Sequence, residues 1–203
     1  MIILTAANKN FEHHLLRMLE SVKKFNYDVH VYDLGGLGYG EPYSAPVSNK
    51  AYQKNPIKPQ YILEKLKSLS PNELLVWMDA DTELLDRIDE LEDISFDLGV
   101  TLRHGKPKRE KDGKFNSGVL FFRNNSRTIN FMEQWAELSK ELNGDQWSLN
   151  TLIEKTDRKN LSIYEFSGKV YNNFYFDEDQ SMAKILHYKS GTGRRVLRNK
   201  GSE

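Results

Sequence analysis

Leu74-Leu75-Val76-Trp77-Met78-Asp79-Ala80-Asp81 is a run of five apolar residues that ends in two aspartates with one alanine between them. A strand this apolar is typical of the middle of a mainly parallel sheet, where both faces are covered. Ligands of open α/β sheets bind just beyond the carboxyl ends of such strands. The run therefore predicts an α/β fold with Asp79 and Asp81 at its ligand-binding edge.

Two carboxylates held close together at a sheet edge repel each other unless a cation or buried donors compensate their charge. Oxygen ligands of this kind suit Mg²⁺ or Mn²⁺, and either ion can bind a diphosphate and neutralise its charge as it departs. Aspartates also start loops in many proteins, which is the alternative for Asp79 and Asp81. The apolar strand that precedes them favours the metal site.

Composition narrows the class of protein. The chain has 203 residues, which suits one domain, and its 29 lysines and arginines balance its 29 aspartates and glutamates. Because the net charge is zero, the protein has no overall positive potential that would favour nucleic acid or an anionic membrane as a partner. No apolar stretch has the length of a membrane span, and the first residues lack the features of a secretory signal. The lack of cysteine excludes disulfides, thiolate nucleophiles and sulfur-ligated zinc, and we expect a cytoplasmic protein.

Hydrophobic periodicity predicts alternating strands and helices. We expect strands at residues 2–6, 29–32, 74–78, 98–102, 119–122, 163–166 and 185–188, and helices that begin after Asn8 or Asn10, at Pro59, at Leu84, near Ser126 and after Asp145. The helix from Leu84 should end at Leu91. Residues 1–193 should form one Rossmann-like domain, with a mixed, mainly parallel sheet flanked by helices. We expect long loops at residues 35–56 and 103–114, and a basic tail at residues 194–203.

Four segments carry a resemblance to a known family. They are, in chain order, Asp79-Ala80-Asp81 after its apolar strand, Asn116-Ser117-Gly118-Val119-Leu120-Phe121-Phe122, Asp145-Gln146 with Leu149-Asn150, and the late His187. Their shared order resembles the glycosyltransferases of GT-A fold, most closely the group of glycogenin and the lipopolysaccharide galactosyltransferases. The resemblance covers most of residues 1–193 in patches, and no single patch decides it.

This resemblance implies a single-domain GT-A fold and a hexosyltransferase. Such an enzyme moves a sugar from a nucleotide-sugar, with a UDP-sugar favoured, to a hydroxyl group of a carbohydrate or other acceptor, with retention of the anomeric configuration. The implied cofactor is Mn²⁺ or Mg²⁺, and its implied ligands are Asp79, Asp81 and His187. A neutral imidazole and two carboxylates leave positions on an octahedral ion for diphosphate oxygens. For His187, a hydrogen-bonded histidine near a strand end is the alternative.

The resemblance also implies a set of residues around the donor. They are Thr5, Ala6 and Asn8 for the nucleoside, Ala80 between the metal ligands, Lys58, Lys189, Gly191 and Arg194 for the phosphates, and Asn116 and Ser117 for the donor sugar or the acceptor. Gly118, which follows them, permits a close approach of the backbone. The segment after His187 departs from the family's spacing, and a solvated basic tail is the alternative for Lys189 and Arg194. A tail that ordered over the donor would exclude water and favour transfer over hydrolysis.

Asp145 and Gln146 are the candidate catalytic residues. By resemblance the pair touches the transferred sugar, with Gln146 near its anomeric carbon, whereas the alternative for Asp145 is a simple helix N-cap. Retention requires no strong protein base, because the leaving phosphate can take the acceptor proton. Inversion would require a carboxylate base, for which Asp145 is the first candidate and Asp177 or Asp179 the next.

Two other classes of function stay open on the sequence alone. Haloacid dehalogenase-type phosphohydrolases also place Asp-x-Asp at a strand end, with the first aspartate as the nucleophile. That family has threonine or valine two residues after the second aspartate, where this chain has Glu83. A non-catalytic nucleotide- or carbohydrate-binding module is the third hypothesis, because 203 residues are few for a transferase of this fold.

Overall fold

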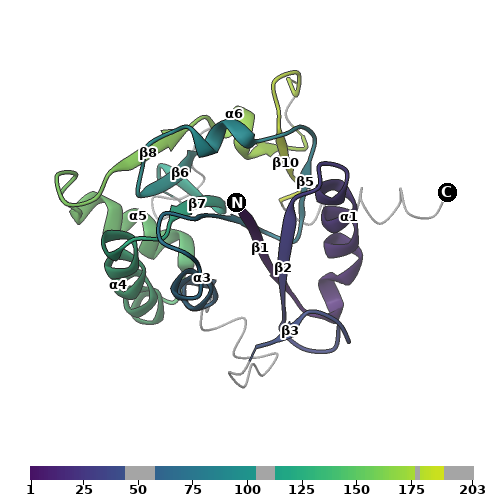
Figure 1. Cartoon of the computed structure of the whole chain (residues 1–203), viewed down its shortest axis with the longest axis horizontal. Coiled ribbons are helices and arrows are strands. Elements are labelled where there is room, and N and C mark those ends of the chain that lie inside the picture. Colours follow the sequence, from purple (N-terminus) through teal and green to yellow (C-terminus); the bar gives the residue numbers. More distant parts are fainter. Residues whose placement is uncertain (44–57, 104–112, 177–178, 190–203) are drawn as a thin grey trace.

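The computed structural model describes residues 1–43, 58–103, 113–176 and 179–189. Its centre is a seven-stranded sheet in the order β3-β2-β1-β4-β7-β6-β8 (Figure 1). The strands are β1 (Ile2–Ala7), β2 (Asp28–Asp33), β3 (Glu41–Pro42), β4 (Leu74–Met78), β6 (Leu98–Leu102), β7 (Phe115–Arg123) and β8 (Ile163–Phe166). Neighbouring strands are parallel except for β7, which runs antiparallel to both β4 and β6. The expected α/β fold with a mixed, mainly parallel sheet is therefore confirmed.

Helices cover both faces of this sheet. α1 (Glu12–Lys23) lies on one face, and α3 (Lys58–Lys67), α4 (Ser126–Leu142) and α5 (Asp145–Lys155) lie on the other (Figure 1). Short turns of helix are η1 (Lys9–Phe11), η2 (Asp89–Glu92) and α6 (Gly168–Tyr171). Within the described ranges, no helix combines the length and the apolar character that crossing a bilayer requires.

The position of β4 explains why its sequence is apolar throughout. Leu75 and Trp77 belong to the core beneath α3, α4 and α5, whereas Leu74, Val76 and Met78 belong to the core beneath α1. All of these side chains are buried. Burial of one aliphatic or aromatic side chain contributes about 1.5–3 kcal/mol. Hydrophobic burial on two faces thus fixes the strand whose end carries the aspartates.

The first β-α-β unit sets the direction of the ligand edge. β1 pairs in parallel with β2 on one side and with β4 on the other, so the carboxyl ends of these strands meet at one edge of the sheet. At the end of β1, the Asn8 side chain accepts a hydrogen bond from the backbone N–H of Asn10 and starts η1. We expected helical structure to begin after Asn8 or Asn10, and η1 begins directly after Asn8, which is its N-cap.

A second, three-stranded sheet connects the late part of the chain to the aspartates. It has the order β5-β10-β9 and consists of β5 (Thr82–Leu84), β9 (Asn173–Phe174) and β10 (Ile185–His187). β10 runs antiparallel to β5, with His187 opposite Thr82. The pairing therefore brings His187 beside the residue that directly follows Asp81.

The predicted helix at residues 84–91 is wrong. Thr82–Leu84 is extended, because it pairs with β10, and within residues 84–91 helical geometry begins only with the 3-10 turn η2. Leu84, Ile88 and Leu91 are all buried, so their helix-like spacing reflects contact with one core and not an α-helix.

The start of β7 also differs from the prediction. The expected strand was residues 119–122, but β7 begins at Phe115, so Asn116 and Ser117 lie inside the strand. The side-chain amide of Asn150 bonds the backbone N–H and C=O of Phe115 at 2.8 and 3.0 Å, and so ties α5 to the start of β7. β3 lies within the first part of the predicted loop 35–56, and residues 44–57, 104–112 and the tail 194–203 lie outside the described residues.

A buried carboxylate joins three elements at the opposite end of β4. Asp97 accepts two hydrogen bonds from the Arg127 guanidinium, at 2.9 and 2.7 Å, one from Asn125 Nδ2 and one from the backbone N–H of Ser162. Burial alone would raise the pKa of Asp97, but these donors outweigh it and lower the pKa. The ionised carboxylate therefore ties β6 to the start of α4 and to β8.

Asp97→Asn should lower the free energy of unfolding at pH 7 by about 1–3 kcal/mol, because a hydrogen-bonded, charge-assisted acceptor is lost. The folded-state pKa lies below the unfolded value of about 3.9, so this contribution is complete above that value and is lost as pH falls through the folded pKa. Urea unfolding should show the wild type and the variant converging as the pH falls below about 4 and through the folded-state pKa. Glu137→Gln, at an exposed pair with Lys140, is the control, and an equal loss there would contradict the prediction.

Candidate functional site

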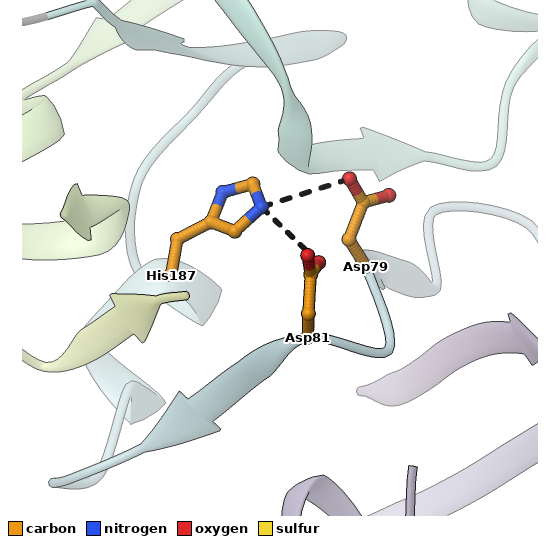
Figure 2. A group of neighbouring side chains, drawn as sticks. All are labelled: Asp79, Asp81 and His187. Atoms are coloured by element: carbon orange, nitrogen blue, oxygen red, sulfur yellow. Dashed lines mark ion pairs between the residues drawn. The ribbon is translucent and has the colours of Figure 1, made fainter. Parts of the chain in front are cut away.

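Asp79, Asp81 and His187 come together at the carboxyl edge of β4 (Figure 2). Asp79 directly follows β4, Asp81 directly precedes β5, and His187 ends β10. His187 Nε2 lies 3.2 Å from Asp81 Oδ1 and 3.9 Å from Asp79 Oδ2. The candidate ligand atoms of all three residues lie within 4.8 Å of one another. The chain thus gathers the three residues that the resemblance implied as metal ligands.

Backbone hydrogen bonds hold the loop that carries the two aspartates. The carbonyl of Asp79 accepts from both the N–H and the hydroxyl of Thr82, and the N–H of Asp79 donates to the carbonyl of Gly118. The carbonyl of Asp81 accepts from the N–H of Tyr188 at 2.8 Å. The carboxylates therefore stand on a turn that is fixed to β7 on one side and to the end of β10 on the other.

Hydrogen bonds of Glu83 and Tyr188 stabilise this turn further. The Tyr188 hydroxyl donates to Glu83 Oε2 at 2.6 Å, and Arg17 on α1 donates to the same oxygen at 3.1 Å. Burial and the bond to Glu83 raise the pKa of Tyr188, so its hydroxyl stays protonated and remains a donor. Glu83 is therefore a structural acceptor that links β5, the segment after β10 and α1.

Gly118 leaves the space in which the His187 ring lies. A Cβ atom at residue 118 would stand 2.3 Å from His187 Cε1 and 2.7 Å from His187 Nδ1, far closer than real Cβ contacts. The imidazole therefore packs directly on the backbone of β7. The close approach expected at Gly118 is made by the histidine.

Lys58 lies on the other side of Asp79. Its Nζ is 2.8 Å from Asp79 Oδ1 and 2.8 Å from Asp145 Oδ2, and it donates to the carbonyl of Ser117 at 3.1 Å. Trp77 Nε1 also donates to Asp79 Oδ1 at 2.9 Å. Burial alone would lower the pKa of Lys58, but Asp145 and Asp79 outweigh it and raise the pKa. One oxygen of Asp79 thus faces a fixed cation, and the other faces His187.

Asp145 is not the N-cap of α5, because Gly144 occupies that position and Asp145 is the first helical residue. Its carboxylate instead accepts from the Ser117 hydroxyl at 2.8 Å and pairs with Lys58. Burial alone would raise the pKa of Asp145, but Lys58 and Ser117 lower it. Asp145 is therefore held as a weakly basic carboxylate. Sequence reasoning named both Lys58 and Asp145 but missed their direct pairing.

Lys189 and Gln146 border the same site. Lys189 Nζ lies 3.3 Å from Gln146 Oε1 and 5.9 Å from the centre of the Phe174 ring. Burial lowers the pKa of Lys189, and the nearby charge of Asp79 opposes this effect. The Lys189 ammonium therefore lies largely buried beside the start of α5. Gly191 and Arg194 lie outside the described residues.

Buried side-chain atoms that lack a hydrogen-bond partner within the described residues include Thr5 Oγ1 in β1 and Asn116 Nδ2 in β7. Leaving a buried donor unpaired costs about 1–3 kcal/mol, so such atoms are typical of positions that a ligand satisfies. Asn116 Oδ1, in contrast, accepts from the N–H of Gly118 at 2.7 Å, which fixes the amide.

The small residues of the predicted nucleoside site have ordinary structural environments. Ala6 is buried near the end of β1, and Ala80 packs with Ala7 and Leu15 in a small apolar cluster. The Asn8 side chain is used as the cap of η1. These contacts neither require nor prevent an approaching nucleoside.

Protein-family models match residues 74–196, more than half of the chain, to the nucleotide-diphospho-sugar transferases. The chain belongs to this family. Among curated proteins, no sequence matches it. The matched segment contains all three candidate metal ligands and the Asp145–Gln146 pair.

Solved structures of glycosyltransferases share the fold. A glycosyltransferase involved in the glycosylation of the major capsid of PBCV-1 has a TM-score of 0.72 at 13% identity, over 100% of this chain and 98% of that one. The galactosyltransferase LgtC, in complex with donor and acceptor sugar analogs, gives 0.60 at 16% identity, over 100% and 96%. GlyE of Streptococcus pneumoniae TIGR4 gives 0.62 at 13% identity, over 94% and 54%. At these identities the likeness establishes the GT-A fold, as expected.

Membership of the nucleotide-diphospho-sugar transferases also decides between two of the hypotheses for Asp79-Ala80-Asp81. The expected class of enzyme, a glycosyltransferase, is confirmed, and the phosphohydrolase hypothesis is set aside. Within this family, a group of two carboxylates and one histidine at the carboxyl edge of the sheet could hold a divalent cation.

Gly118→Ala should displace the His187 ring, because the new methyl group would overlap Cε1 and Nδ1. We expect Mn²⁺ affinity to fall by about tenfold or more, and stability to fall by about 1–3 kcal/mol from overpacking. Electron paramagnetic resonance of free Mn²⁺ and urea unfolding measure the two effects. The control is Gly144→Ala, whose Cβ would meet its nearest atom at 3.8 Å. Unchanged Mn²⁺ affinity in folded Gly118→Ala would contradict the assignment.

Proposed function

We propose that the chain is a metal-dependent glycosyltransferase that moves a sugar from a nucleotide-diphosphate sugar, with a UDP-sugar favoured, to a hydroxyl group of a carbohydrate or other acceptor. The observation that carries this proposal is the convergence of Asp79, Asp81 and His187 at the ligand edge of a nucleotide-diphospho-sugar transferase. We further propose that the anomeric configuration is retained and that the protein is cytoplasmic.

The candidate metal ligands Asp79, Asp81 and His187 fit Mn²⁺ or Mg²⁺. Asp81 and His187 are buried and Asp79 is partly buried, so the carboxylates have lost much of their hydration. Two such charges beside each other are stable only with compensation, and a divalent cation supplies it with ligand types that both ions accept. When bound, the ion would neutralise the charge that develops on the departing diphosphate.

The surrounding residues supply the remaining contacts of the donor. Lys58 and Lys189 present positive charges from distant parts of the sequence, and both are buried enough to favour a nearby anion. Asn116 offers an unpaired N–H₂ group, which suits a sugar hydroxyl. Asp145 and Gln146 open α5 beside Lys58 and Lys189, where their oxygens can orient the sugar and its anomeric carbon.

Retention is favoured by the state of Asp145. A carboxylate that is paired with Lys58 and has a lowered pKa is a poor general base. Asp179 accepts from Ser181 and also has a lowered pKa, and Asp177 lies outside the described residues. We therefore propose that the bond from the anomeric carbon to diphosphate breaks, the bond to the acceptor oxygen forms on the same face, and the acceptor proton passes to a diphosphate oxygen.

A thermal-shift panel of nucleoside diphosphates and nucleotide-sugars with Mn²⁺ tests the donor class. At a fixed concentration, a ligand that binds only the folded state raises the melting temperature more the tighter it binds, and we expect UDP and UDP-sugars to give the largest shift. A sugar-transfer assay with the best donor then separates a catalyst from a non-catalytic binding module. Binding without transfer or hydrolysis would favour the module.

The double variant Asp79→Asn/Asp81→Asn should lose Mn²⁺-dependent UDP binding and slow sugar transfer by at least about 100-fold, because neutral amides cannot replace the carboxylate ligands. Calorimetric titration of UDP with and without Mn²⁺ measures the first effect. Asp28→Asn, at an exposed position in β2, is the matched control. Metal-dependent UDP binding that survived in the double variant would exclude this metal site.

Lys58→Met should separate metal binding from donor binding. Loss of its positive charge beside Asp79 should leave Mn²⁺ binding intact or tighten it by a few-fold, whereas UDP affinity should fall by about 10- to 100-fold because the diphosphate loses the attraction of a nearby positive charge. Titration of Mn²⁺ alone, and then of UDP at saturating Mn²⁺, gives the two constants. Lys67→Met is the control, because Lys67 lies on the same helix and pairs with Glu133 on the surface. Equal UDP affinity in Lys58→Met and wild type would remove Lys58 from the donor site.

A further inference from the structure

The side of the His187 ring that faces away from the aspartates has its own buried partner. His187 Nδ1 lies 2.8 Å from Asn172 Oδ1, and Asn172 Nδ2 donates to Thr101 Oγ1 at 2.8 Å. Asn172 is 1% exposed, Thr101 0% and His187 2%, so water does not compete for these bonds. The three side chains form a line from β6, through the segment before β9, to the end of β10.

The orientation of the Asn172 amide follows from Thr101. The Thr101 hydroxyl is within reach of two backbone acceptors, the carbonyls of Asn116 at 3.3 Å and Val119 at 3.1 Å. Its proton is directed to these carbonyls, so its lone pair accepts the N–H of Asn172. The amide oxygen of Asn172 must then face His187, where only a protonated Nδ1 can donate to it.

We infer that Asn172, oriented by Thr101, is a positioning residue that holds His187 as the Nδ1–H tautomer and directs the Nε2 lone pair to the metal between Asp79 and Asp81. This inference rests on the proposed metal-dependent function. The second nitrogen of a metal-binding histidine is commonly held by an acceptor that fixes both the tautomer and the ring angle. Here the acceptor is an amide, and Gly118 provides the surface against which the ring lies.

The contribution of Asn172 differs from that of a buried packing residue. Loss of the amide would leave the ring free to rotate away from the aspartates and to exchange its tautomer. Removing such an acceptor typically weakens metal affinity by about 10- to 100-fold. A purely structural role would lower stability and leave the metal affinity of the folded protein unchanged.

The test is the dissociation constant of Mn²⁺ alone, measured on the full chain by electron paramagnetic resonance. Asn172→Leu keeps the approximate shape and removes the acceptor, and we expect affinity to fall by about 10- to 100-fold. Asn172→Asp keeps an acceptor for Nδ1–H, and the Thr101 hydroxyl can turn to donate to its other oxygen, so affinity should stay within a few-fold of wild type. Circular dichroism and thermal unfolding establish that each variant is folded.

Thr101→Val gives a second route to the same result if Asn172→Leu does not fold. It keeps Asn172 but removes the acceptor that orients the amide, so Mn²⁺ affinity should fall. Thr128→Val is the matched control, because Thr128 is also 0% exposed and donates to a backbone carbonyl, that of Asp97, at the opposite end of the sheet. It should lose stability without losing Mn²⁺ affinity.

The outcomes separate this inference from the proposed function. A wild-type chain that binds no Mn²⁺ would overturn the metal-dependent function and this inference with it. A wild type that binds Mn²⁺, together with folded Asn172→Leu and Thr101→Val variants that bind it equally well, would overturn the role of Asn172 alone. Equal loss in Asn172→Asp and Asn172→Leu would also overturn it, because the acceptor would then not be the property that matters.

Discussion

Compensation of charge at the end of β4 is the constraint on which the site depends. Hydrophobic burial on two faces fixes β4, and the chain then places Asp79 and Asp81 where water is partly excluded. Charges in such a place require partners, because their lost hydration is otherwise not recovered. Lys58 and Trp77 meet one oxygen of Asp79, and His187 faces the other oxygen and Asp81. The surroundings of Asp79 are therefore asymmetric. One of its oxygens faces the ammonium group of Lys58, and the other lies beside His187 and Asp81, whose atoms are of the types that bind a divalent cation.

The mixed sheet is what allows distant residues to meet there. In a fully parallel sheet the start of β7 would lie at the far edge from Asp79. Because β7 is antiparallel to β4, with Val119 opposite Met78, its early residues Asn116–Gly118 stand at the carboxyl end of β4. The small second sheet adds His187, which ends β10 opposite Thr82. The antiparallel direction of β7 and the pairing of β10 with β5 thus surround the end of β4 with polar groups.

The local hydrophobic pattern of the sequence was enough to predict the elements whose position is set by burial of their own apolar residues. The apolar run 74–78 and the alternation of strand and helix around α1 predicted β4 and the first β-α-β unit, because period and burial coincide there. The same reasoning failed at residues 84–91, where buried Leu84, Ile88 and Leu91 mimic a helix although Thr82–Leu84 pairs with a strand from the end of the chain. His187 was found only through family resemblance, since its pairing with Thr82 leaves no local signal. The Lys58–Asp145 pair was missed for the same reason.

The two carboxylate oxygens of Asp79 have different partners, and these partners have different roles. Lys58 compensates Asp79 and Asp145 within the folded chain itself, so part of the charge at the ligand edge is balanced by the protein alone. Formation of the carboxylate loop then depends chiefly on its backbone bonds to Gly118, Thr82 and Tyr188. A cation that binds to such a preformed group spends little of its binding free energy on ordering the chain. The interaction of the bound cation with the diphosphate is then not offset by a cost of ordering the chain. The charge of the diphosphate is the charge that the proposed reaction has to stabilise.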